Sequence, residues 1–262
     1  MSKEEYLITD APLKALTVFA MPMILGSFFQ QVYNMADSII VGQFVGSSAL
    51  AAVGACAALT NVFICVALGA GVGAGVLVSR YFGAREYGKM KTIVSTSLIS
   101  FLVLSILLGV FGFCFSHGMM SGLQTPADIL EEAVLYLRVY FVGFPFLFMY
   151  NILSTMFTSI GESKIPLGLL IFSSILNIGM DLWMVAGLGL GVFGAALATL
   201  IAQGISAVLS LLIFLYRMRR YQSTFAWFDG RELRSMLQIA VPSVLQQSTV
   251  SIGMMIVQAV VN

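Results

Sequence analysis

A stripe of polar side chains lies within an apolar run that extends from residue 15 to about residue 45. Its members are spaced at i, i+3, i+4 and i+7, which places them on one face of a helix: Gln30, Tyr33, Asn34 and Asp37. If this run crosses a membrane, the carboxyl group cannot face lipid, because an ionisable group deep in hydrocarbon costs about 2.5 kcal/mol or more. We therefore expect the stripe to face protein or a water-filled cavity and to mark a functional site.

The composition places the chain among integral membrane proteins. Of its 262 residues, 59% are hydrophobic and only 10% are charged, whereas soluble domains have about 25% charged residues. Apolar segments long enough to cross a bilayer as helices, about 20 residues each, lie at 15–43, 52–80, 93–116, 133–159, 166–187, 193–216 and 236–262. They lack the alternating pattern of barrel strands. The predicted fold is therefore an all-α transmembrane bundle with six complete spans and most of a seventh.

The distribution of Lys and Arg predicts the orientation of these spans. The loops after spans two, four and six contain basic residues, whereas the loops after spans one, three and five contain none. Cytoplasmic loops of membrane proteins carry the excess of Lys and Arg. The alternation therefore predicts a multi-pass protein of the cytoplasmic (inner or plasma) membrane with its N-terminus in the cytoplasm.

The chain begins to repeat itself near its C-terminal end. A shift of 220 residues aligns Pro22 with Pro242, and identities also occur at Leu13, Ala20, Leu25, Met35 and Val41. Because six spans per unit is an even number, a second unit would enter the membrane from the same side, giving two parallel halves. We therefore expect 1–220 to form the N-terminal six-helix lobe of a two-lobe, twelve-helix transporter. Residues 221–262 would hold the interlobe cytoplasmic loop and the first helix of the second lobe, truncated at the chain end.

A second carboxyl group lies within the spans at a depth compatible with that of Asp37. It belongs to Asp181 in the fifth span, and Asn177 precedes it by one turn on the same helical face. Thr199 lies about two turns into the sixth span. Two carboxylates, an amide oxygen and a hydroxyl are hard oxygen ligands that suit Na⁺ or a proton rather than a thiophilic metal. We expect these four residues to form an ion-binding site, with no cofactor beyond the Na⁺ or H⁺.

The positions of proline and glycine in three of the spans predict local features of the helices. Pro22 lies within the first span and Pro145 within the fourth, where the missing N–H donor and the ring favour a bend in the helix. Four glycines recur in the second span: Gly69, Gly71, Gly73 and Gly75. Because no strand precedes them, they are predicted to serve close helix packing rather than phosphate binding.

Several motifs, taken in order, resemble those of the multidrug and toxic compound extrusion (MATE) transporters. They are Ala20-x-Pro22 and Tyr33-Asn34-Met35-Ala36-Asp37 in span one, Gly83-Ala84-Arg85 after span two, Gly143-x-Pro145 in span four, Gly161-Glu162-Ser163-Lys164 after it, Asn177-x-x-x-Asp181 in span five, and Gly194-Ala195-Ala196 through Thr199 in span six. The resemblance extends over the whole chain, and the order and spacing of the motifs carry it.

The resemblance implies a transporter rather than an enzyme, with two six-helix lobes around a V-shaped cavity. Entry of Na⁺ or H⁺ would drive the efflux of organic cations or drugs by alternating access, with the cation bound in the N-terminal lobe by Asp37, Asn177, Asp181 and Thr199. Expected partners are a small organic cation, membrane lipid and the C-terminal lobe, and no nucleic acid. Some members carry an acidic residue in the seventh span; 236–262 has none, which favours the N-terminal site. Candidate cavity-lining residues are Gln30, Tyr33, Asn34 and Asn151.

Two other functions fit parts of this pattern. A flippase of lipid-linked saccharides has the same architecture, but its anionic pyrophosphate cargo calls for several basic residues in the cavity, and only Arg138 is available for that role. Intramembrane aspartyl proteases also use two aspartates on separate helices. The residues before Asp37 and Asp181 match neither the Gly-x-Gly-Asp nor the Tyr-Asp context expected there. Both alternatives are therefore disfavoured.

Overall fold

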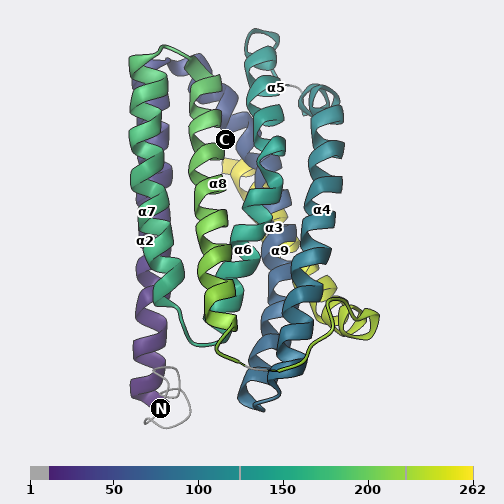
Figure 1. Cartoon of the computed structure of the whole chain (residues 1–262). Helices are drawn as coiled ribbons and strands as arrows, with labels where there is room; N and C mark the ends of the chain where they lie inside the picture. Colours follow the sequence, from purple (N-terminus) through teal and green to yellow (C-terminus); the bar gives the residue numbers. More distant parts are fainter. Residues whose placement is uncertain (1–11, 124, 222, 262) are drawn as a thin grey trace.

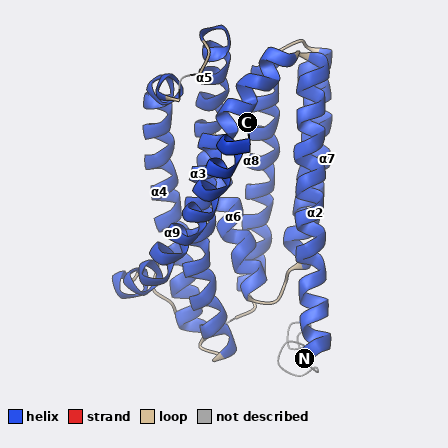
Figure 2. Ribbon diagram, turned by 180° about the vertical axis from the view of Figure 1, so that it is seen from behind, coloured by secondary structure: helices blue, strands red, loops and turns tan. Residues whose placement is uncertain are grey.

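The computed structural model describes residues 12–123, 125–221 and 223–261, and every regular element within these ranges is helical. In chain order the elements are α2 (Pro12–Phe44), α3 (Ser47–Gly83), α4 (Tyr87–Gly122), α5 (Ala127–Val142), α6 (Phe144–Ser159), α7 (Lys164–Asp181), the π-helical turn η1 (Leu182–Gly187), α8 (Gly191–Met218) and α9 (Gly230–Val261). They form an upright bundle with α2 and α7 side by side at one edge and α4 at the opposite edge (Figure 1). Seen from behind, α9 crosses α3 diagonally (Figure 2).

The helices confirm the predicted membrane bundle. Five of them are each long and apolar enough to cross a bilayer, and α5 with α6 forms a sixth candidate as a bent pair. These six coincide with the first six predicted spans. The seventh, 236–262, lies on α9 up to Val261, and its last residue is outside the described residues; α9 is not among the candidate spans when the described residues are considered. Its role as a membrane span, and the division into 1–220 and 221–262, remain predictions.

The fourth span is divided into α5 and α6 at Gly143, and the two helices are bent by 52° relative to each other. Pro145 lies in the first turn of α6, where a residue without an N–H loses no intrahelical hydrogen bond. The first span instead runs through Pro22 as the single helix α2. The two prolines therefore differ in local structure, since Pro145 lies in the first turn of a helix and Pro22 lies in the interior of one.

The glycines of α3 allow it to pack closely between α6 and α9. A Cβ atom at Gly69 would lie 2.5 Å from the Cα atom of Val244, and one at Gly73 would lie 2.6 Å from a backbone carbonyl oxygen of α9. On the other side, a Cβ atom at Gly75 would lie 2.8 Å from the Cγ2 atom of Thr155 on α6. These distances leave no room for a side chain, so the prediction that the glycines serve helix packing is confirmed.

Two apolar clusters hold the bundle together. The larger contains buried side chains of α3, α4, α5, α6, α8 and α9, but none from the described part of α2. At its centre the ring of Phe63 makes edge-on contacts with Phe141 and Phe144, at centroid distances of 5.2 and 5.4 Å. The smaller cluster lies where α2 ends, α3 begins and η1 meets α8. Helix α2 is thus attached to the outside of the main core.

Substitution of Gly73 by Val tests the packing of α9. The added methyl groups overlap the backbone of α9, so the free energy of unfolding in detergent should fall by about 1–3 kcal/mol. Gly54→Val is the matched control, because Gly54 lies in the same helix and a Cβ atom there meets nothing within 4 Å. Equal losses in the two variants would show that the glycine stripe is not needed for packing.

Candidate ion-binding site

The four residues predicted to bind an ion are brought together from three helices. Asp37 comes from α2, Asn177 and Asp181 from the C-terminal end of α7, and Thr199 from α8. Asn177 and Asp181 are 1% and 0% exposed, and Thr199 is also buried. Asp37 is half-buried. Three of the four residues are therefore fixed in the interior, and the fourth is carried by the peripheral helix α2.

The carboxyl groups of Asp37 and Asp181 lie within hydrogen-bonding distance of each other. Two ionised carboxylates repel strongly where water is scarce, and a hydrogen bond between two carboxyl groups requires that one of them carry a proton. The Oδ1 atom of each residue is buried and has no hydrogen-bond partner among the described residues. The arrangement fits a proton or a cation, because either one removes the repulsion.

The side-chain amide of Asn177 can hydrogen-bond to both Asp181 and Thr199 in one of its two orientations. Its nitrogen then donates to Oδ2 of Asp181 at 2.8 Å, and its oxygen accepts from the hydroxyl and the backbone N–H of Thr199, both at 3.2 Å. In the reverse orientation the nitrogen would donate to the Thr199 hydroxyl, but the amide oxygen would face the carboxylate, which is repulsive. We adopt the first orientation on this ground. Asn177 therefore fixes the Asp181 carboxyl group against α8.

Local backbone structure brings α8 to this position. The chain leaves Asp181 through the π-helical turn η1, a rare conformation that often occurs at functional sites. Helix α8 contacts this turn at Gly194, where a Cβ atom would lie only 3.3 Å from the backbone carbonyl oxygen of Met184. Since a larger residue would push α8 away, the small side chain allows Thr199 to reach the end of α7.

Three tyrosines adjoin the carboxyl pair. Tyr33, one turn before Asp37 on α2, lies close to Thr199. Tyr136 and Tyr140 stack on α5 at a centroid distance of 6.3 Å, and Tyr136 is close enough to Asp37 to interact electrostatically with it. Sequence reasoning does not find Tyr136. The one signal available is its i, i+4 spacing from Tyr140, which places both rings on one helical face.

The smaller apolar cluster covers the site at one end of the bundle. Its buried members are Ile40, Val41, Ala49, Val185, Val192 and Ala195. They lie beyond Asp37 and Asp181 along α2 and η1, and before Thr199 along α8. The cluster therefore excludes water from the carboxyl pair on the side of the α2–α3 turn.

The other predicted cavity-lining residues do not join the carboxyl pair. Gln30 and Asn34 are exposed on α2, where the Gln30 amide donates to the Asn34 side chain at 3.4 Å. Asn151 is half-buried on α6 and donates to a backbone carbonyl of its own helix at 2.8 Å. Of the predicted stripe on α2, Tyr33 and Asp37 thus face the site, and Gln30 and Asn34 face outward.

An open groove of about 580 Å³ separates part of α2 from α7. It lies around Pro22, some four helical turns from Asp37, and is therefore distinct from the ion site. Its wall is formed by Thr17, Val18, Met21, Pro22, Leu25, Lys164, Leu167, Gly168 and Ile171. Near Pro22, then, α2 is incompletely packed against its main neighbour.

Sequence comparison matches a model of the MatE family to residues 22–183. The chain is 29% identical over 250 residues to the probable multidrug resistance protein YpnP of Bacillus subtilis (strain 168), covering 95% of this chain and 56% of that protein. It is 28% identical over 277 residues to the probable multidrug resistance protein YoeA of the same strain, covering 100% and 59%. The chain thus spans somewhat more than half the length of these relatives.

Solved structures of MATE transporters share the helix arrangement. A MATE in complex with MaL6 superposes with a TM-score of 0.91 at 27% identity, over 99% of this chain and 58% of that one. An outward-facing MATE family transporter of the MOP superfamily gives 0.87 at 27% identity, over 97% and 57%. An inward-facing conformation gives 0.75 at 27% identity, over 86% and 52%. The arrangement of this chain is closer to the outward-facing structure than to the inward-facing one.

Replacement of Asn177 by Ala tests the geometry of the site. Loss of the amide leaves a buried carboxylate oxygen and the Thr199 hydroxyl without their partner, so the free energy of unfolding in detergent should fall by about 1–3 kcal/mol. Asn151→Ala is the control, because that side chain donates only to its own helix. A smaller loss for Asn177→Ala than for Asn151→Ala would contradict the bridging role of Asn177.

Proposed function

Because the chain belongs to the MatE family, whose members among its relatives and solved structures are transporters rather than enzymes, we propose that it exports organic cations by antiport with Na⁺ or H⁺. The observation that carries the proposal is the pair of carboxyl groups, Asp37 and Asp181, within hydrogen-bonding distance inside the bundle. Drug export is supported by the names of its relatives, two probable multidrug resistance proteins. The ion site supplies the coupling.

The two candidate ions make different demands on this site. A proton shared by Asp37 and Asp181 needs no other ligand, and the amide of Asn177 already donates to Asp181 in the orientation that suits a proton. Sodium instead needs several oxygen ligands. For Asn177 to supply one, its amide must turn over, so that the oxygen leaves Thr199 and faces the carboxyl pair. Removal of the Asn177 amide should therefore weaken Na⁺ binding while leaving protonation possible.

Ion binding is coupled to transport through α2 in this proposal. Asp181 is linked to α8 through Asn177, whereas Asp37 has no such link and lies on a helix that, like α7, contributes no buried side chain to the main core. Pro22 lies inside α2, removes one intrahelical hydrogen bond and permits a bend. Neutralisation of the pair lets Asp37 pack against Asp181, and loss of the ion separates them. These two positions of α2 are the alternative states that alternating access requires.

The substrate would contact the outward face of α2. This face carries the exposed amides of Gln30 and Asn34, and the exposed Phe28 and Met35 lie further around the same helix. Aromatic rings and thioethers attract lipophilic cations without demanding one shape. In a two-lobe arrangement this face would line the central cavity, with the N-terminus and the even-numbered loops in the cytoplasm as the Lys and Arg distribution predicts.

The two alternative functions receive less support. Paired aspartates would also suit an aspartyl protease, but the related proteins are transporters. A saccharide-lipid flippase needs basic residues for pyrophosphate. Arg138 is engaged elsewhere, since its Nε donates to Ser116 at 3.1 Å and its guanidinium lies over the ring of Phe113 at 5.6 Å.

Asp37→Asn should reduce drug efflux to the background of cells that lack the transporter. The amide keeps the shape of the carboxyl group, but it can no longer exchange a proton or attract Na⁺ with a negative charge. Membrane insertion should be retained, because the substitution removes a buried charge. The measurement is accumulation of a fluorescent organic cation, with membrane levels of the protein checked in parallel. Asp128→Asn, at an exposed position on α5, is the control; unchanged efflux in Asp37→Asn would exclude this residue from coupling.

The double variant Asp37→Asn, Asp181→Asn tests whether the two carboxyl groups act as one site. Residues that work as a unit give non-additive losses of activity. The transport rate of the double variant should therefore be no lower than that of the less active single variant. Initial rates of efflux from proteoliposomes under an imposed Na⁺ or H⁺ gradient provide the comparison. Losses that multiply in the double variant would assign the two aspartates to independent steps.

A further inference from the structure

The segment between α8 and α9 is attached to the outer side of α4. Figure 1 shows the chain crossing below the bundle after α8 and reaching the far side of α4, where α9 begins. Three hydrogen bonds fasten it: Ala226 N–H to the Thr92 hydroxyl at 3.1 Å, the Ser95 hydroxyl to the Trp227 carbonyl at 2.6 Å, and Asp229 N–H to the Thr96 hydroxyl at 3.1 Å. All three partners lie on α4, at the level where the predicted span 93–116 begins. The segment therefore lies at the edge of the membrane-spanning part of α4.

Three large aromatic side chains of this segment are exposed. Phe225, Trp227 and Phe228 are 40%, 74% and 50% exposed, and the rings of Phe225 and Trp227 are 5.5 Å apart. Contiguous exposed aromatic surface is unusual on a water-facing loop. Aromatic residues are enriched where a protein surface passes from water to hydrocarbon, because their rings suit the headgroup region.

One face of α4 gives the depth of these rings. Ser95, which holds the Trp227 carbonyl, is followed on the same helical face by exposed apolar residues one, two and three turns further on: Ile99, Leu102 and Ile106. One turn before Ser95 on this face is Lys91. The face thus changes from basic to apolar at Ser95, which places Trp227 at the boundary between headgroups and hydrocarbon.

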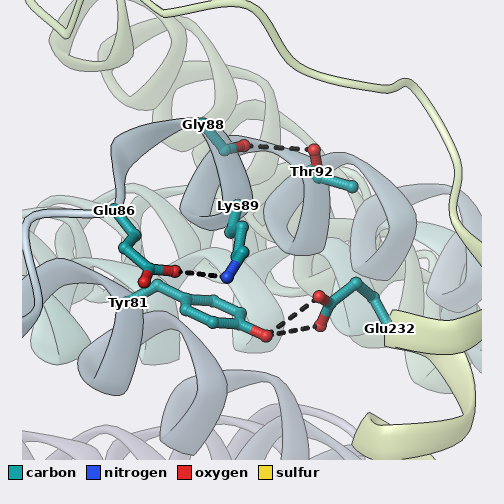
Figure 3. Close-up of polar contacts among 6 residues, drawn as sticks. All are labelled: Tyr81, Glu86, Gly88, Lys89, Thr92 and Glu232. Atoms are coloured by element: carbon teal, nitrogen blue, oxygen red, sulfur yellow. Dashed lines mark hydrogen bonds and ion pairs between the residues drawn. The ribbon is translucent and has the colours of Figure 1, made fainter.

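Lys91 and Lys89 have different surroundings. The ammonium group of Lys91 lies over the ring of Phe225 at 5.7 Å, beside the exposed aromatic side chains. The ammonium group of Lys89 pairs with Glu86 at 2.8 Å and lies over the ring of Tyr81, whose hydroxyl donates to Glu232 (Figure 3). The charge of Lys89 is thus compensated by Glu86, whereas the charge of Lys91 lies beside the exposed aromatic rings.

We propose that Phe225, Trp227, Phe228 and Lys91 form a docking surface for an anionic lipid headgroup of the cytoplasmic leaflet. The rings lie in the headgroup region, and the ammonium group binds the lipid phosphate above Phe225. A lipid held there fixes the depth of the segment that leads into α9. The assignment to the cytoplasmic leaflet rests on the orientation given under the proposed function, but contact with lipid does not depend on transport or on ion binding.

The chain offers a direct spectroscopic test, because it has two tryptophans, Trp183 and Trp227. The variant Trp183→Phe leaves Trp227 as the single reporter. After reconstitution into phosphatidylcholine vesicles, its emission should be quenched by brominated phosphatidylglycerol more strongly than by the same fraction of brominated phosphatidylcholine. Bromines placed near the headgroup should quench more than bromines deep in the acyl chain.

Matched lysine variants in the same background test the charged part of the surface. A basic residue near an anionic membrane surface contributes roughly 1 kcal/mol, so Lys91→Gln should lower the preference for phosphatidylglycerol about fivefold. Lys89→Gln should leave the preference unchanged, because Glu86 already compensates that charge. Circular dichroism of each variant checks that the helices are retained.

Four results would overturn the proposal. Quenching of Trp227 by aqueous iodide but not by brominated lipid would show that the rings lie in water, and insensitivity to both quenchers would show that protein covers them. Equal quenching by the two brominated lipids would show that the surface has no preference for an anionic headgroup. Loss of the preference on adding inorganic phosphate would show a site for free phosphate rather than lipid. None of these results bears on efflux, so the lipid surface and the proposed antiport can fail separately.

Discussion

Two carboxyl groups buried side by side cannot both be ionised unless a cation lies between them. This constraint governs the arrangement around Asp37 and Asp181, which lie within hydrogen-bonding distance on two different helices. Each has a buried oxygen without a partner among the described residues. In the proposed mechanism a proton or Na⁺ would therefore help to hold α2 against α7, and the position of α2 would depend on ion occupancy.

The packing of the rest of the bundle fits the proposed dependence, because α2 lies outside the main core. Helices α3 to α6, α8 and α9 share the larger apolar cluster, and glycines on α3 allow close packing on two sides. Asn177 holds the Asp181 carboxyl group against α8. Helix α2 lies outside the large cluster, next to an open groove at Pro22. In the proposed mechanism a change of charge at Asp37 would thus act on a helix that lies outside the large cluster.

Sequence reasoning succeeds where the membrane makes a residue costly. Asp37 and Asp181 can be found because a carboxyl group inside an apolar span needs a partner, and the first six spans follow from hydropathy. It fails where tertiary contacts decide. Helical periodicity places Gln30 and Asn34 on the same face as Asp37, but that face is wide enough for them to point away from α7. Tyr136 is not predicted from the sequence, because a tyrosine in a membrane span does not carry the free-energy cost of a carboxyl group.

Backbone details are also set by packing rather than by local sequence. Nothing in the residues after Asp181 predicts the π-helical turn η1, whose shape matches the close approach of α8 at Gly194. Pro145 lies in the first turn of α6, next to a 52° bend, while Pro22 remains inside one helix. The same residue type thus has two structural outcomes, because Gly143 interrupts the helix before Pro145.

The central claim is that Asp37 and Asp181 share one exchangeable cation, and infrared difference spectroscopy tests it most directly. In Na⁺-free buffer, the wild-type protein should show the carbonyl stretch of one protonated carboxyl group that is absent from both Asp37→Asn and Asp181→Asn. If Na⁺ is the coupling ion, titration with Na⁺ should remove this band; if H⁺ is, the band should change only with pH. A spectrum in which the variants retain every protonated-carboxyl band of the wild type, at all pH values and Na⁺ concentrations, would contradict the shared site.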